Sequence, residues 1–175
     1  MQFVVQMAGM PGSGKSRLAR GIGAACKAVV LDKDVIKSAA LNAGAEESLA
    51  AGLAYEVLFD LARSLLGMGQ SVVLDSPAFY PQIVEKGRHL AANAGASYHI
   101  IECVCADREE LARRLFAGER LRSQPRGLEQ LVDPASLPGT APIERPRLVV
   151  DTTRTEAECL RLALEYIGET RGVPG

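Results

Sequence analysis

The chain opens with two adjoining stretches, FVVQMA at residues 3–8 and GMPGSGKS at residues 9–16. The first is a short apolar run that predicts a strand. The second fits G-x-x-x-x-G-K-[ST], a loop whose backbone N–H groups cradle phosphate oxygens. Its glycines allow the positive φ angles that turn those N–H groups inward. The residues predicted to bind a nucleotide phosphate here are Gly9, Met10, Pro11, Gly12, Ser13, Gly14, Lys15, Ser16 and Arg17.

Lys15 and Ser16 give this loop its chemistry. The ammonium group of Lys15 can reach the β- and γ-phosphates of a nucleotide, and the hydroxyl of Ser16 is placed to ligate Mg²⁺. Apolar side chains at Leu18, Ala19 and Ile22 predict a helix that starts here and directs its positive end toward the same phosphates. A glycine-rich turn with an incidental lysine would need neither this helix nor the preceding strand. A nucleotide-phosphate site is therefore the better interpretation.

The composition is that of an ordinary globular protein. The 175 residues are 47% hydrophobic and 23% charged, and their number predicts one domain over residues 1–175. A net charge of −1 gives no overall drive toward nucleic acid or a membrane surface. The apolar N-terminal run is too short for a signal peptide, and no stretch approaches the ~20 apolar residues of a membrane span. We therefore expect a cytoplasmic protein.

The cysteines are Cys26, Cys103, Cys105 and Cys159, and no two of them form a C-x-x-C motif. The two histidines have no ligand-like spacing around them, so no zinc site is predicted. In a reducing compartment such thiols usually serve as small buried hydrophobic side chains. We expect Cys103 and Cys105, which lie in one apolar run, to be chemically inert.

Apolar runs alternate with helical periodicity along the rest of the chain. This alternation predicts an α/β fold, with a five-stranded parallel sheet and helices on both faces. Residues 123–146 are rich in proline and glycine and predict a loop. The expected strands cover residues 3–8, 28–31, 71–75, 98–105 and 148–150, and helices follow from about residues 16, 35, 46, 81, 107 and 155. The apolar face of the helix expected over residues 46–68 comprises Leu49, Leu53, Val57, Leu58, Leu61 and Leu65.

Acidic residues follow or end three of the apolar runs. Asp34 follows the second expected strand, Asp75 ends the third, and Asp107 follows the fourth. Open parallel sheets bind ligands beside the carboxyl ends of their strands, so Asp34 and Asp75 suit Mg²⁺ binding and general-base chemistry. Each carboxylate could instead cap the helix that follows it. For Asp107, whose helix has two glutamates in its first turn, capping is the better interpretation.

Arginines are frequent between residues 108 and 126. A solvated helix face accounts for Arg108 and Arg113. Arg120 and Arg122 lie where helix gives way to loop, which makes them better candidates for contact with a ligand. We therefore expect an arginine-containing lid over approximately residues 118–146.

Together these motifs resemble one group of P-loop kinases. The group includes polynucleotide 5′-kinases, chloramphenicol phosphotransferase and the zeta toxins. The similarity rests on the phosphate loop, the D-x-x-K motif of Asp34 and Lys37, the run GQSVVLD at residues 69–75, and Arg114 and Arg120. It extends from Met1 to about residue 122, with a weaker match at residues 149–153. The resemblance implies a three-layer, nucleoside-kinase-like P-loop fold, an AAA-type ATP-binding kinase domain.

The resemblance also implies roles for single residues. Asp34 matches the aspartate that accepts the proton of the attacking hydroxyl. Lys37 matches a basic residue that holds the acceptor, although the family usually has arginine there, and lysine cannot form a bidentate fork. Asp75 matches an acid that assists Mg²⁺, directly or through water. Arg114 and Arg120 match lid arginines that close over the transferring phosphoryl group. The segment with Thr152 matches the part of the family site near the adenine ring.

The function expected from these residues is transfer of the γ-phosphate of ATP to a hydroxyl of a small molecule, with Mg²⁺ as the metal. One alternative is a kinase acting on nucleic-acid 5′ ends. The near-neutral charge and an aromatic content of 5% without tryptophan make a long base-stacking surface unfavourable. The other alternative is an ATPase or nucleotide switch that acts through a protein partner. The acceptor, the pathway and the oligomeric state are not specified by the sequence.

Overall fold

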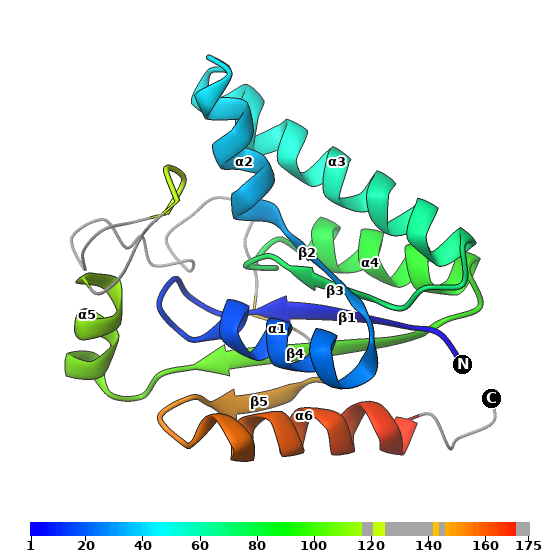
Figure 1. Ribbon diagram of the computed structural model, residues 1–175, viewed down its shortest axis with the longest axis vertical. Helices are drawn as coiled ribbons and strands as arrows, with labels where there is room; N and C mark the ends of the chain where they lie inside the picture. The colour runs from blue at the N-terminus through cyan, green and yellow to red at the C-terminus, as the bar shows by residue number, and fades with distance from the viewer. Residues whose placement is uncertain (117–120, 125–141, 144–145, 171–175) are drawn as a thin grey trace.

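The computed structural model describes residues 1–116, 121–124, 142–143 and 146–170. Five parallel strands form one sheet in the order β2-β3-β1-β4-β5 (Figure 1). This confirms the predicted five-stranded parallel sheet. β1 lies at its centre, so the loop that follows β1 emerges in the middle of the carboxyl edge. The strands are β1 (Phe3–Ala8), β2 (Val29–Asp32), β3 (Val72–Asp75), β4 (Ser97–Val104) and β5 (Leu148–Asp151).

Helices cover both faces of the sheet. Helices α1 and α6 pack on one face and α3 and α4 on the other, while α2 lies against α3 and α5 follows the end of β4 (Figure 1). None of the described helices is long and apolar enough to cross a bilayer. The helices are α1 (Lys15–Cys26), α2 (Lys33–Asn42), α3 (Glu47–Gly67), α4 (Pro81–Asn93), α5 (Arg108–Phe116) and α6 (Glu156–Thr170).

The central strand explains why the first apolar run is continuous. Phe3, Val5 and Met7 pack into the cluster beneath α1 and α6, and Val4 packs into the cluster beneath α3 and α4. Side chains of a strand alternate between the two faces, and both faces are covered here, so every position of β1 is buried. Full burial of each large apolar side chain contributes about 1.5–3 kcal/mol. The position of the phosphate loop is therefore fixed by a central strand that is buried along its whole length.

The buried face of α3 agrees with the predicted leucine face at Leu58 but differs from it elsewhere. Leu49, Leu53 and Leu61 are 62%, 44% and 45% exposed. The helix instead buries small residues at four-residue spacing, which let its backbone approach the sheet closely. Leucine periodicity could not identify this face because alanines form a second stripe at the same period. The buried residues of α3 are Ala50, Ala54, Leu58, Phe59, Ala62 and Leu66.

The segment after α5 is described only in part. Residues 121–124 pack against α2, where the Arg122 guanidinium donates to the carbonyl oxygen of Leu41 at 2.8 Å. The Ser123 backbone N–H donates to the Ser38 hydroxyl at 3.1 Å. Most of the expected lid over residues 118–146, Arg120 included, lies outside the described residues.

Candidate active site

The glycine-rich loop between β1 and α1 has the backbone that a phosphate cradle needs. Gly12 and Gly14 have φ angles of 81° and 87°, which residues with a Cβ rarely adopt. At Gly9 a Cβ would lie 2.1 Å from the carbonyl oxygen of Cys103, so only glycine fits there. No described side chain caps the start of α1, which leaves its N–H groups to face an anion.

Lys15, the first residue of α1, lies across this loop. Its Nζ donates a hydrogen bond to the carbonyl oxygen of Met10 at 3.2 Å. Its charge also acts on Asp75, at the end of the neighbouring strand β3. The fold therefore brings the loop cation, the start of α1 and a strand-end carboxylate together, although Asp75 is 60 residues away in sequence.

A cleft of about 670 Å³ opens beside the loop. Its walls are the phosphate loop, the ends of β2 and β3, helix α5 and the turn after β5. Gly9, Met10, Ser13 and Lys37 do not line it. The predicted site residues in its lining are Pro11, Gly12, Gly14, Lys15, Ser16, Arg17, Asp34, Asp75, Arg114 and Thr152.

Asp75 lies at the bottom of this cleft and is 4% exposed. Burial raises the pKa of its carboxyl, while the Lys15 ammonium and a hydrogen bond from the Ser16 side chain act in the opposite direction. A buried carboxylate normally requires such partners. Ser16 and Asp75 therefore present adjacent oxygen atoms directly beside the phosphate loop.

The helix cap that precedes the candidate base is Asp32. Its carboxylate accepts hydrogen bonds from the N–H groups of Asp34 at 2.8 Å and Val35 at 3.4 Å. Asp34 lies within the first turn of α2, so the alternative that Asp34 caps this helix is wrong. Burial raises the pKa of the Asp32 carboxyl, and its two backbone hydrogen bonds oppose that rise.

The capping alternative is correct for Asp107. Its carboxylate accepts from the N–H groups of Glu109 at 2.9 Å and Glu110 at 3.1 Å. The Asp107 side chain therefore has the structural role that the sequence predicted for it.

The structure does not bring Lys37 to the cleft. Its Nζ pairs with Glu47 at the start of α3, and this contact ties α2 to α3. The lysine beside Asp34 is Lys33, whose Nζ lies 3.2 Å from the Oδ1 atom of Asp34. Helical geometry explains the difference, because the carboxylate of Asp34 turns back toward the first residue of α2. An acceptor-binding role for Lys37 stays a prediction, and in this arrangement its ammonium pairs with Glu47.

Arg114 lines the cleft, and hydrogen bonds hold its guanidinium in place. Its guanidinium donates at 2.8 Å to both the side-chain and the main-chain oxygen of Thr152, and at 2.7 Å to Glu110. The Thr152 hydroxyl in turn contacts the carbonyl oxygen of Ser13 at 2.8 Å. The arginine and the threonine thus brace the phosphate loop against β5. Arg120, the other expected lid arginine, lies outside the described residues.

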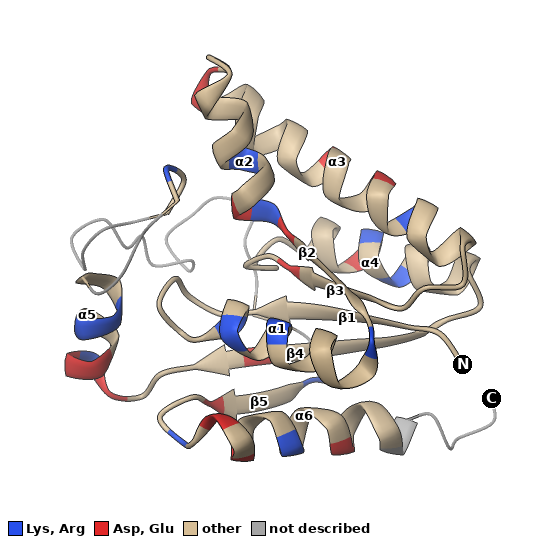
Figure 2. Cartoon of the chain, in the orientation of Figure 1, with Lys and Arg blue, Asp and Glu red and all other residues tan. Residues whose placement is uncertain are grey.

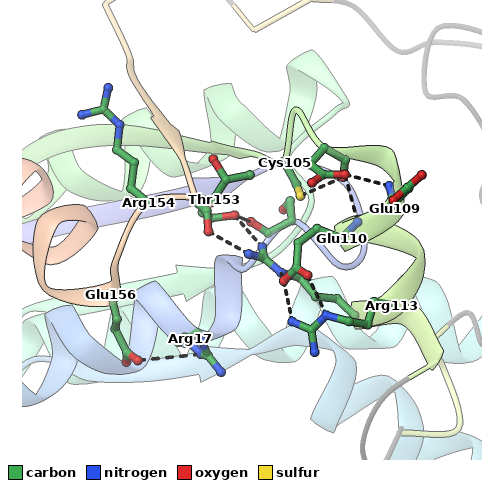
Figure 3. Close-up of polar contacts among 12 residues, drawn as sticks. Arg17, Cys105, Glu109, Glu110, Arg113, Thr153, Arg154 and Glu156 are labelled. Atoms are coloured by element: carbon green, nitrogen blue, oxygen red, sulfur yellow. Dashed lines mark hydrogen bonds and ion pairs between the residues drawn. The ribbon is translucent and has the colours of Figure 1, made fainter.

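Two further arginines line the cleft. Arg113 turns toward Glu110 on its own helix, and Arg17 of α1 reaches Glu156 of α6 (Figure 3). Hydrogen bonds from Arg113 and Arg114 lower the pKa of Glu110 to about 2. Arg17 and Glu156 are 3.9 Å apart and mostly exposed, so their ion pair is weak.

Residues 4–130 match the family model of an AAA domain. The chain belongs to this AAA domain family. No curated protein matches the chain.

Solved structures place the AAA domain among proteins with the fold of P-loop kinases, as the sequence resemblance implied. A gluconokinase from Sinorhizobium meliloti has a TM-score of 0.60 and 21% identity over 96% of this chain and 93% of its own. The APS kinase of Mycobacterium tuberculosis, in complex with AMPPNP and APS, scores 0.63 with 21% identity over 95% and 98%. Kti12 of Chaetomium thermophilum, in complex with ADP–AlF3, scores 0.63 with 17% identity over 98% and 100%.

The residues beside the loop of this AAA domain fit a magnesium ion. Ser16 and Asp75 supply one hydroxyl and one carboxylate, and Mg²⁺ typically combines few protein ligands with substrate phosphates and water. Within the described part of the chain, no group of three acidic, histidine or cysteine side chains could hold a metal by itself. A site completed by nucleotide phosphates is consistent with both observations.

Asp75→Asn should raise the stability of the nucleotide-free protein but weaken its stabilisation by Mg²⁺–ATP. The substitution removes a carboxylate that burial disfavours, so the melting temperature without nucleotide should rise by a few degrees. The further rise that Mg²⁺–ATP gives the unsubstituted chain should shrink, because one metal ligand is lost. Thermal unfolding of both chains with and without Mg²⁺–ATP measures this. Equal stabilisation of both chains by Mg²⁺–ATP would contradict a metal-binding role for Asp75.

Sequence reasoning missed Lys33 and Gln124. Lys33 stands between two aspartates in the sequence, and this alternation of charge was the available signal. No sequence pattern pointed to Gln124, because its Nε2 atom reaches the Oδ2 atom of Asp34 at 3.4 Å across 90 residues.

Ser76, next to Asp75, has a buried hydroxyl without a partner among the described residues, and it lines the cleft.

The two strand-end cysteines should react differently with thiol reagents. Cys103 is 1% exposed, and burial raises the pKa of its thiol to about 12, so little thiolate forms at pH 8. Cys105 lies just past the end of β4 and is half-buried, so the expectation of burial was wrong for this residue. Mass spectrometry after iodoacetamide treatment should show Cys105 labelled well before Cys103. Equal rates in the native protein would contradict the difference in burial.

Proposed function

We propose that this protein transfers the γ-phosphate of ATP to a hydroxyl group of a small molecule. The observation that carries the proposal is that residues of the phosphate loop and Asp34 line one and the same cleft. The structural relatives with bound AMPPNP or ADP–AlF3 support an adenine nucleotide as the donor. The kinases among these relatives support transfer to an acceptor.

Each element of the cleft has a defined part in this reaction. Lys15 and the N–H groups at the start of α1 bind and orient the phosphates. Ser16 and Asp75 would hold Mg²⁺, which neutralises phosphate charge when bound. Asp34 accepts the proton of the attacking hydroxyl. Phosphoryl transfer depends mainly on such positioning and charge neutralisation, which suits the small number of reactive side chains present.

The charges near Asp34 favour a small, uncharged acceptor over a nucleic-acid 5′ end. Binding a phosphate backbone requires several cations that can face it. Lys33 pairs with Asp34 and Lys37 pairs with Glu47. Asp32 adds a second carboxylate to this part of the lining. Among the described residues, the charges around Asp34 are therefore close to balanced and do not form a basic groove.

An acceptor screen tests the proposal directly. ADP release from Mg²⁺–ATP would be followed with sugars, polyols, nucleosides, amino alcohols and a 5′-hydroxyl oligonucleotide, against a background with water alone. We expect at least one small hydroxyl compound to raise ADP release and to acquire labelled phosphate. Stimulation by the oligonucleotide alone would favour the 5′-end kinase. Slow hydrolysis that no acceptor accelerates would favour a nucleotide switch acting through a protein partner.

A further inference from the structure

Lys33 occupies an unusual position at the start of α2. Its side chain is only 13% exposed, and its Nζ lies 3.2 Å from the Oδ1 atom of Asp34. Acidic and basic residues adjoin at this end of the helix (Figure 2). The structure assigns Lys33 as the positioning residue that holds the Asp34 carboxylate in the cleft. This inference rests on the proposed function, in which Asp34 is the general base.

Two contacts hold the Lys33 ammonium, the Asp34 carboxylate and the Tyr55 ring. It lies 5.5 Å from the centre of the Tyr55 ring on α3, a distance at which a cation is attracted to an aromatic face. The Asp32 cap fixes the backbone of the first turn of α2, and hence the point from which the lysine side chain starts. The ammonium is therefore held between the ring and the carboxylate, and it lines the same cleft as Asp34.

A second residue, Gln124 of the segment after α5, also approaches the Asp34 carboxylate. Gln124 Nε2 lies 3.4 Å from the Oδ2 atom of Asp34, and the Ser123 hydroxyl donates to the Asp34 carbonyl oxygen at 3.1 Å. Lys33 thus contacts one carboxylate oxygen and Gln124 the other. A carboxylate bracketed in this way has fewer rotamers, and a general base must lie within hydrogen-bond reach of the proton that it removes.

Lys37 is the competing candidate, and the geometry separates the two lysines. Lys37 pairs with Glu47 and does not line the cleft, so it joins two helices. Lys86 provides a matched control on the outer surface. Its Nζ lies 5.0 Å from the Phe59 ring centre and 2.8 Å from Glu56, so like Lys33 it contacts one aromatic ring and one carboxylate, but it does not line the cleft.

The test uses the full chain, Mg²⁺–ATP as donor and water as the probe acceptor, with ADP release as the readout. Lys33→Met should lower kcat by about 10- to 100-fold and leave the KM for ATP unchanged, because a misplaced base affects the transfer step. Lys33→Arg should restore most of the rate. Lys86→Met should leave kcat unchanged, and Lys37→Met should have a smaller effect than Lys33→Met. In the Asp34→Asn background, Lys33→Met should cause no further loss.

Several outcomes would overturn the assignment. One is a larger kcat loss for Lys37→Met than for Lys33→Met. Another is that Lys33→Met lowers kcat by the same factor in the unsubstituted chain and in the Asp34→Asn chain, which would indicate a general structural effect. Unchanged turnover in Asp34→Asn would instead remove Asp34 as the base, and so the proposed mechanism. A double-mutant cycle in thermal unfolding measures the Lys33–Asp34 contact separately, and zero coupling there would refute the contact itself.

Discussion

Lys15→Ala should abolish most ATP-dependent turnover, with a loss of at least about 100-fold, as expected when a cation aimed at the transferring phosphate is removed. In the structure its Nζ lies across the loop, 3.2 Å from the Met10 carbonyl oxygen, and the residue belongs to neither of the two large apolar core clusters. The chain should therefore still fold. Isothermal titration with Mg²⁺–ATP should show weakened binding, and circular dichroism should show an unchanged helix content.

Lys27→Met is the matched control for this prediction. Lys27 caps the opposite end of the same helix and is exposed, so the substitution removes one positive charge without altering the phosphate loop. Its turnover and nucleotide affinity should equal those of the unsubstituted chain. If Lys15→Ala retained full affinity for Mg²⁺–ATP and full turnover, the phosphate-loop interpretation would be wrong.

Asp34→Asn should lower kcat by about 10²–10⁴-fold, the usual contribution of a general base. The shape of the side chain is kept, and the loss of its partly exposed pairing with Lys33 costs below about 1 kcal/mol. ATP affinity should change little, because the Asp34 side chain contacts Lys33 and Gln124, which lie outside the phosphate loop. Turnover, nucleotide affinity and melting temperature of the same preparation together test this prediction.

Asp32→Ala, unlike Asp34→Asn, should clearly lower the stability of the fold. Asp32 accepts two backbone hydrogen bonds at the start of α2, and loss of such a cap costs typically about 1 kcal/mol. Thermal unfolding should therefore show a clear loss for Asp32→Ala and little for Asp34→Asn. An Asp34→Asn chain with full turnover on its acceptor would contradict the base assignment, since the structure has already excluded a capping role.

Much of the fold followed from local pattern. A continuous apolar run needs cover on both faces, and runs of this kind alternate with helices along the whole chain, so a parallel sheet between helices was predictable. The buried face of α3 was not predictable in the same way. Leu49, Leu53 and Leu61 lie on one face of that helix and the buried alanines on another, and only packing against the sheet decides which face is covered.

The candidate site likewise has one part that local sequence predicts and another that depends on tertiary contacts. Gly12, Gly14, Lys15 and Ser16 are contiguous, and their roles follow from backbone freedom, charge and a hydroxyl at fixed spacing, so the sequence alone determined the phosphate loop. The surroundings of Asp34 depend on contacts that local spacing does not encode. Pairing of Lys37 with Glu47 and the approach of Gln124 across 90 residues arise only when α2, α3 and the segment after α5 pack together. Tertiary structure therefore decided which lysine faces the candidate base, because side-chain direction on a helix is set by its neighbours as well as by its period.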